Sequence, residues 1–150
     1  MLRKLEYFSN RNDLGIFQRV FLLILRYRFR KWSIKLGFSI PINVFGPGLA
    51  IVHYGTIIVN HNARIGANCR IHACTNIGAS GGSNKAPIIG DNVYIAPGAK
   101  IFGDIFIANN TAIGANAAVN KSFLEENTLI AGIPARVIKR IDITRIIATI

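Results

Sequence analysis

The residue best suited to acid–base chemistry in this sequence is His53, which lies in the apolar stretch AIVHYGTIIV, residues 50–59. An imidazole changes protonation near neutral pH, so it can act as a general base toward a hydroxyl group. A histidine within apolar neighbours can equally be a packed, hydrogen-bonded core residue. The elements that surround His53 must decide between these two interpretations.

The surrounding sequence repeats with a period of six. An aliphatic residue recurs every sixth position from Val59 to Val119, and only Ser83 interrupts the series. The members are Val59, Ile65, Ile71, Ile77, Ile89, Ile95, Ile101, Ile107, Ile113 and Val119. This period fits neither a 3.6-residue helix nor an alternating strand, and it is typical of a parallel β-helix with three hexads per coil. His53 falls on the same register, six residues before Val59.

The repeat divides the 150-residue chain into three segments. Residues 1–36 are basic and apolar, and 14–36 predict a helix. Residues 37–140 predict the solenoid, from which the glycine-rich loop 79–88 departs. Residues 141–150 predict a C-terminal capping tail, because a solenoid needs its open end covered. The fold class is therefore mainly β, a β-helix preceded by a helical segment.

The net charge of +11 is concentrated at the N-terminus, where residues 1–36 hold nine Lys or Arg against two acidic residues. The helix at 14–36 either packs on the solenoid end or a partner subunit, or lies on a membrane surface. A nucleic-acid partner is not expected, because no nucleic-acid motif accompanies the charge. Cys69 and Cys74 are expected to be reduced, structural thiols, and no signal-peptide pattern is evident. These features predict a cytoplasmic protein, at the inner face of the membrane if the helix binds lipid.

Several motifs resemble those of the hexapeptide-repeat acyltransferases, specifically the serine acetyltransferase branch with its relatives in surface-polysaccharide gene sets. They are the VHYG histidine, NIGASGGSNKAPIIGDNVYIAPGAKIFGDI, AIGANAAV and IAGIPARVI. The resemblance implies a homotrimer of left-handed β-helices with active sites between neighbouring solenoids. It also implies acetyl-CoA as co-substrate and His53 as the general base. His61 and His72 do not match the catalytic position, and we expect surface or interface roles for them.

The resemblance also implies residues that bind CoA. Small side chains let the pantetheine arm approach the coils, and basic side chains meet its phosphates. The matching positions are Ala96, Ala115, Asn120, Lys121 and Lys139, with Arg136 and Arg140 beside the last of these.

Two departures from the serine acetyltransferase pattern concern the catalytic base and the acceptor. Ser39 stands where these enzymes carry the Asp that orients the histidine, and residues 14–90 contain no Asp or Glu. A backbone carbonyl, Ser39 or Asn43 is then expected to orient His53. Val52 and Lys85–Ala86 replace the Asp and the Arg-His pair that hold serine, which favours a sugar hydroxyl near Tyr54 and Lys85 as acceptor.

The sequence therefore predicts an acetyl-CoA-dependent O-acetyltransferase that acts on a sugar of a surface polysaccharide or its precursor. One alternative is a true serine O-acetyltransferase of cysteine biosynthesis, and another is a non-catalytic trimeric scaffold. A carbonic-anhydrase-like zinc site is not expected, because His53, His61 and His72 are spaced 8 and 11 residues apart. Equivalent positions on successive coils differ by about 18 residues, so these histidines should not converge on a metal.

Overall fold

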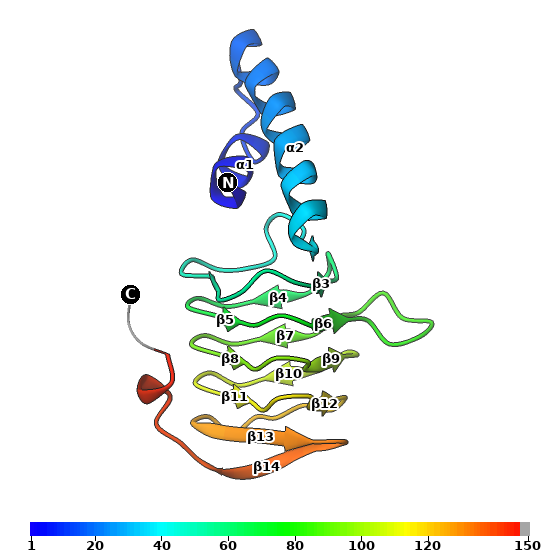
Figure 1. The fold of residues 1–150 in the computed structure, drawn as a ribbon, viewed down its shortest axis with the longest axis vertical. Helices are drawn as coiled ribbons and strands as arrows, with labels where there is room; N and C mark the ends of the chain where they lie inside the picture. Colours follow the sequence, from blue (N-terminus) through cyan, green and yellow to red (C-terminus); the bar gives the residue numbers. More distant parts are fainter. Residues whose placement is uncertain (148–150) are drawn as a thin grey trace.

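The computed structural model describes residues 1–147 and has two parts along its long axis, a helical hairpin and a stacked solenoid (Figure 1). The hairpin consists of α1 (Leu2–Ser9) and α2 (Ile16–Leu36). Leu5, Leu14, Leu22 and Leu25 form a small core between them. Helix α1 was not expected from the sequence as a separate element.

The solenoid is the predicted left-handed parallel β-helix, and its short strands form three sheets. Sheet A contains β1 (Phe38–Ser39), β3 (Ile57–Val59), β6 (Thr75–Gly78), β9 (Lys100–Phe102) and β12 (Ala118–Val119). Sheet B contains β4 (Arg64–Ile65), β7 (Ile88–Ile89) and β10 (Phe106–Ile107). Sheet C contains β2 (Ala50–Ile51), β5 (Arg70–Ile71), β8 (Tyr94–Ile95), β11 (Ala112–Ile113), β13 (Thr128–Gly132) and β14 (Ala135–Arg140).

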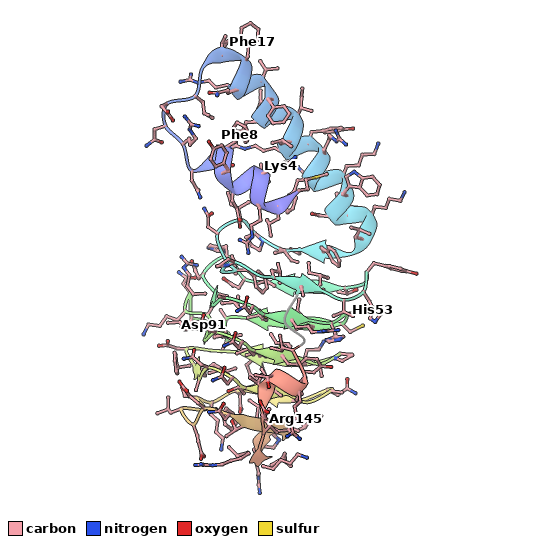
Figure 2. All side chains as sticks on the ribbon, turned by 90° about the vertical axis from the view of Figure 1, so that its left-hand side faces the viewer. Lys4, Phe8, Phe17, His53, Asp91 and Arg145 are labelled. Carbon is pink, nitrogen blue, oxygen red and sulfur yellow. The ribbon has the colours of Figure 1, made fainter. Side chains whose placement is uncertain are left out.

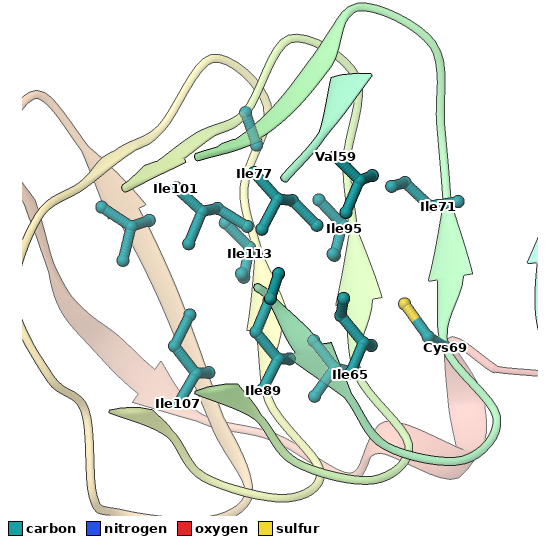
Figure 3. Packing of buried hydrophobic residues seen from close by; sticks show 14 of the residues in the cluster. Val59, Ile65, Cys69, Ile71, Ile77, Ile89, Ile95, Ile101, Ile107 and Ile113 are labelled. Carbon is teal, nitrogen blue, oxygen red and sulfur yellow. The ribbon is translucent and has the colours of Figure 1, made fainter. Parts of the chain in front are cut away.

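The hexad register predicted the core. The ten aliphatic residues of the series are all buried, with exposed fractions between 0% and 4%. They stack on one another along the axis of the solenoid (Figure 3). Cys69 lies among them at 1% exposure, as expected for a small packing residue. Burying aliphatic side chains in this way supplies most of the stability of such a fold.

Two edges of the triangular solenoid carry most of the residues singled out from the sequence, and each edge is a column of turns from successive coils. Edge CA joins sheet C to sheet A and contains residues 52–56, 72–74, 96–99 and 114–117. Edge AB joins sheet A to sheet B and contains residues 60–63, 79–87, 103–105 and 120–122. The loop at 79–87 on edge AB projects beyond the coils after β6 (Figure 1).

The first turn of edge CA breaks the six-residue register, which corrects the expected position of His53. Ile51 pairs with Ile71, and Val59 pairs with Ile77. Val59 is eight residues after Ile51, whereas Ile77 is only six residues after Ile71. The turn at 52–56 therefore holds two extra residues. His53 is therefore exposed on this turn rather than directed into the core.

The C-terminal end also differs from the expectation. The last coil is covered by β14, which runs antiparallel to β13. Residues 141–147 do not cap the solenoid but return along its side, where Ile143 is buried. The remainder of the expected capping tail, 148–150, lies outside the described residues.

Candidate active site

His53 lies on edge CA, near the junction of the solenoid with the helical hairpin. The strand β2 precedes it, and Figure 2 shows its side chain on the flank of the upper coils. The N–H of Gly55 donates a hydrogen bond of 2.9 Å to the carbonyl of Leu36, which ties this turn to the end of α2. Tyr54 on the same turn is 81% exposed. The imidazole is thus presented to solvent by a backbone that is fixed on both sides.

Neither side chain expected to orient His53 does so in this subunit. The amide of Asn43 exchanges two hydrogen bonds of 2.8 and 2.9 Å with the amide of Asn10. The N–H of Asn43 also donates to Glu6 Oε1 at 2.8 Å, so Asn43 joins the first coil to α1. Ser39 lies on β1 in register with Ile58. Within residues 1–147, the side chains of Ser39 and His53 form no hydrogen bond.

His72 was expected to have a surface or interface role, but the structure brings it next to His53. Its side chain is only 8% exposed, and its ring centroid lies 6.3 Å from that of His53 and 4.9 Å from that of Tyr94. Its Nδ1 atom lies 2.9 Å from the carbonyl oxygen of Ile95. The hexad register could have predicted this proximity. Position 72 immediately follows the inward Ile71, and Ile71 pairs with Ile51 at the start of the turn that carries His53.

Two of the expected CoA positions continue the same edge. Ala96 is buried and follows Ile95, which is in register with Ile71. Ala115 is exposed on the next coil of edge CA. Both positions carry only a methyl side chain, on the two coils of edge CA that follow His72.

The other expected residues lie elsewhere in the chain. Asn120 and Lys121 are exposed on edge AB, and the Lys121 Nζ atom lies 5.6 Å from the ring centroid of Phe123. Lys139 is exposed on β14, where it lies opposite Leu129. A single chain thus distributes the expected site residues over edge CA, edge AB and strand β14 of sheet C.

Lys85 in the loop on edge AB is already paired with a carboxylate. Its Nζ atom lies 2.6 Å from Asp104 Oδ2, and both side chains are exposed. The hydrogen bond and charge of Asp104 raise the pKa of Lys85 above its usual value. The neighbouring Ala86 is buried. Lys85 therefore remains a cation, but its charge is partly neutralised within the same subunit.

A cavity of about 500 Å³ lies away from His53, between residues 143–147 and the start of sheet C. Its lining includes Arg70 and the stacked Asn68, Asn92 and Asn110. None of the expected site residues lines this cavity. In the described part of the chain, no three His, Cys, Asp or Glu side chains are grouped closely enough to hold a metal ion.

Comparison with known proteins identifies serine acetyltransferases as similar to this chain, although no family model matches it. Serine acetyltransferase of Staphylococcus xylosus is 38% identical over 97 residues, which are 63% of this chain and 44% of that protein. A serine acetyltransferase solved in complex with CoA matches with a TM-score of 0.69 and 26% identity, over 91% of this chain and 54% of the other. Soybean serine acetyltransferase complexed with serine matches with a TM-score of 0.60 and 33% identity, over 63% and 40% of the two chains. The match thus spans less than half the length of the Staphylococcus xylosus protein.

Proposed function

We propose that this chain, a hexapeptide-repeat protein of the serine acetyltransferase-like branch, is an acetyl-CoA-dependent O-acetyltransferase with His53 as its general base. The observation that carries the proposal is the exposed imidazole of His53 above the small residues Ala96 and Ala115 on one edge of the solenoid. The structural relative in complex with CoA supports the same ligand here.

The proposed reaction needs no covalent intermediate on the protein. The imidazole of His53 takes the proton of the acceptor hydroxyl while the oxygen attacks the thioester carbonyl carbon. The carbon–sulfur bond of the tetrahedral intermediate then breaks, and the imidazolium returns the proton to the CoA thiolate. The products are the acetyl ester and CoA, and His53 ends in its starting state.

We propose that the active unit is a homotrimer. Edge CA carries His53, whereas Lys85, Asn120 and Lys121 lie on edge AB of the same chain. A neighbouring solenoid that brings its edge AB against edge CA would complete one site with residues of both. A monodisperse monomer in light scattering that still turns over acetyl-CoA would contradict this proposal.

Lys121 and Lys139 are the proposed contacts of the CoA phosphates. Both side chains are exposed, and no ion pair involves either of them within residues 1–147. Arg140, by contrast, is paired with Glu125 at 2.6 Å, which makes it a weaker candidate. Free ammonium groups attract phosphate in a way that a neutralised guanidinium does not.

The proposed acceptor is a hydroxyl on a sugar. Free serine needs a carboxylate for its ammonium group, and residues 14–90 contain none. Asp104 is paired with Lys85, and Asp91 accepts the N–H of Ala67 at 2.7 Å, on a different edge from His53. A buried unpaired ammonium is costly, whereas a hydroxyl needs only hydrogen bonds.

L-serine is the second candidate acceptor, because a relative binds serine in its solved structure. The test is CoA release from acetyl-CoA in the presence of L-serine, other amino acids and nucleotide-linked or polymeric sugars. We expect kcat/KM to be higher for a sugar. If L-serine is the best acceptor by tenfold or more, about 1.4 kcal/mol, the chain is a serine acetyltransferase that holds serine with other residues than the Asp and the Arg-His pair. If no acceptor releases CoA, the non-catalytic scaffold replaces the proposed enzyme.

We also propose that α2 contacts an anionic membrane surface. Leu22 and Leu25 are buried against α1, yet the opposite face of α2 exposes a second apolar stripe. Ile16, Val20, Leu23, Tyr27 and Ile34 are between 51% and 72% exposed and recur at spacings of four, three, four and seven residues. No helix within residues 1–147 combines the length and apolarity of a membrane span.

The charges beside this stripe favour lipid as its partner. Arg19, Arg26 and Arg30 follow one side of the stripe, and α2 contains no acidic residue. Arginines that flank an apolar stripe reach toward lipid phosphates while the stripe enters the headgroup region. The face opposite the core of the hairpin is thus apolar at its centre and basic at its margin.

Sedimentation with vesicles tests the membrane proposal. We expect binding to vesicles of phosphatidylcholine with phosphatidylglycerol, weaker binding to phosphatidylcholine alone, and release by salt. Leu23→Gln should weaken binding, and the exposed Leu124→Gln at the far end of the solenoid is the control. If Leu23→Gln leaves binding unchanged but lowers the oligomeric state, the stripe is a subunit contact instead.

A further inference from the structure

The orientation of His53 needs a partner that its own turn does not supply. A general base works with one nitrogen free to accept the proton and the other held by a hydrogen bond. Ser39 and Asn43 do not provide that bond, and the segment 14–90 has no carboxylate. A polar group on a neighbouring coil is the next source to consider.

His72 is such a group, and its tautomer follows from its surroundings. The carbonyl of Ile95 can only accept a hydrogen bond, so Nδ1 of His72 is the donor in the 2.9 Å contact. In the neutral ring, Nε2 then carries a lone pair and can only accept. The side chain is buried, and the ring of Tyr94 lies against it at 4.9 Å between centroids. His72 is thus a fixed acceptor rather than a freely rotating surface histidine.

The position of this acceptor suits His53. The two ring centroids are 6.3 Å apart with an angle of 54° between the ring planes. This separation is within the reach of one bridging water molecule, or of a direct N–H to N bond after a small rotation of the exposed ring. We propose that Nε2 of His72 accepts a hydrogen bond from the ring N–H of His53, directly or through one water, and fixes its catalytic tautomer.

This inference rests on the proposed function of His53 and gives His72 the role of a positioning residue. In this proposal, His72 has the orienting role that the resemblance implies for the carboxylate missing from this chain. A neutral imidazole stabilises the imidazolium of His53 less than a carboxylate would, but its lone pair can still accept the N–H that sets the tautomer. The other ionisable side chain whose ring lies against His72 is Tyr94, from β8.

Two amide substitutions separate the positioning role from a structural one. In His72→Asn, the side-chain amide can still donate to the carbonyl of Ile95, but no group reaches the place of Nε2. In His72→Gln, the longer side chain carries its amide to that place. We expect His72→Asn to lower kcat by about tenfold to a hundredfold, with little change in the KM for acetyl-CoA. We expect His72→Gln to retain most of the activity.

Nitrogen-15 NMR of histidine-labelled protein gives a readout that does not depend on turnover. We expect a single tautomer for His53 in the wild type and in His72→Gln, and a mixture in His72→Asn. Equal activities of the two variants, or an unchanged His53 tautomer in His72→Asn, would overturn the inference. If the wild type has no acetyl transfer but the tautomer still depends on residue 72, the proposed function fails and the contact stands.

Discussion

Gly37 and Gly55 lie in backbone contact, and this contact joins the end of α2 to the turn that carries His53. A Cβ atom placed on Gly37 would lie 3.0 Å from the carbonyl carbon of Gly55. Gly37 also has φ +78°, the left-handed conformation that ends α2. The helical hairpin therefore fixes the first turn of edge CA directly.

We expect Gly37→Ala to lower the free energy of unfolding by about 2 kcal/mol. The substitution has two unfavourable effects, because alanine is strained at a positive φ and its Cβ atom would crowd the backbone of Gly55. Gly81→Ala is the matched control, since Gly81 has open space around its Cβ position and does not adopt a positive φ. That control should change stability by less than about 0.5 kcal/mol. Urea unfolding followed by circular dichroism measures both. Equal effects would mean that the junction does not constrain the first turn.

A second prediction concerns the ion pair between Lys85 and Asp104. We expect Asp104→Asn to increase the rate of proteolysis within 79–87, because this pair joins the loop to the next coil of edge AB. The pair is exposed and screened by solvent, so the unfolding midpoint should not change measurably. Glu125→Gln, which removes the pair with Arg140, is the control and should leave the loop unaffected. Unchanged cleavage in Asp104→Asn would show that the loop is held by other contacts.

The two cysteines should differ in reactivity. Burial raises the pKa of Cys69 from 9.0 to about 12, whereas Cys74 is exposed. Because the thiolate is the reactive form, we expect one thiol to react with a disulfide reagent in the folded protein at pH 8, and two after unfolding. Cys74→Ser should leave none that reacts in the folded state. Two fast thiols in the native protein would contradict the burial of Cys69.

The same shift in pKa predicts how stability changes with pH. The unfolded chain loses the Cys69 proton near pH 9.0, whereas the folded protein keeps it to about 12. The contribution of the buried thiol is therefore complete below pH 9.0 and decreases as the pH rises toward 12. Cys69→Ala should reduce the loss of stability across this interval, measured by urea unfolding at pH 8 and pH 10.5.

The solenoid could be predicted from the repeat, because each aliphatic position of the hexad is directed into the core whatever its contacts with distant parts of the chain. The burial of Ile95 and Ile101 follows from the period of six alone. The exposure of His53 does not, because two extra residues in the turn at 52–56 shift it out of register. Local spacing cannot show how the backbone absorbs such an insertion.

The residues around the base were harder to predict because their contacts cross the chain. Asn43 bonds to Asn10 at the C-terminal end of α1, 33 residues away in the sequence, a pairing that no local pattern indicates. His72 meets His53 because one coil is longer than the regular eighteen residues. The separation of the expected CoA residues between edge CA, edge AB and β14 likewise follows from the stacking of the sheets, not from the motifs.

The central claim is that His53 is the general base of acetyl transfer, and its removal tests this most directly. The measurement is the rate of CoA release by His53→Ala and by Lys4→Ala, a control change at an exposed residue of α1 that lies on neither edge. We predict that His53→Ala lowers kcat by about 10²- to 10⁴-fold with an unchanged oligomeric state, while Lys4→Ala keeps wild-type turnover. Near wild-type turnover by His53→Ala would contradict the account.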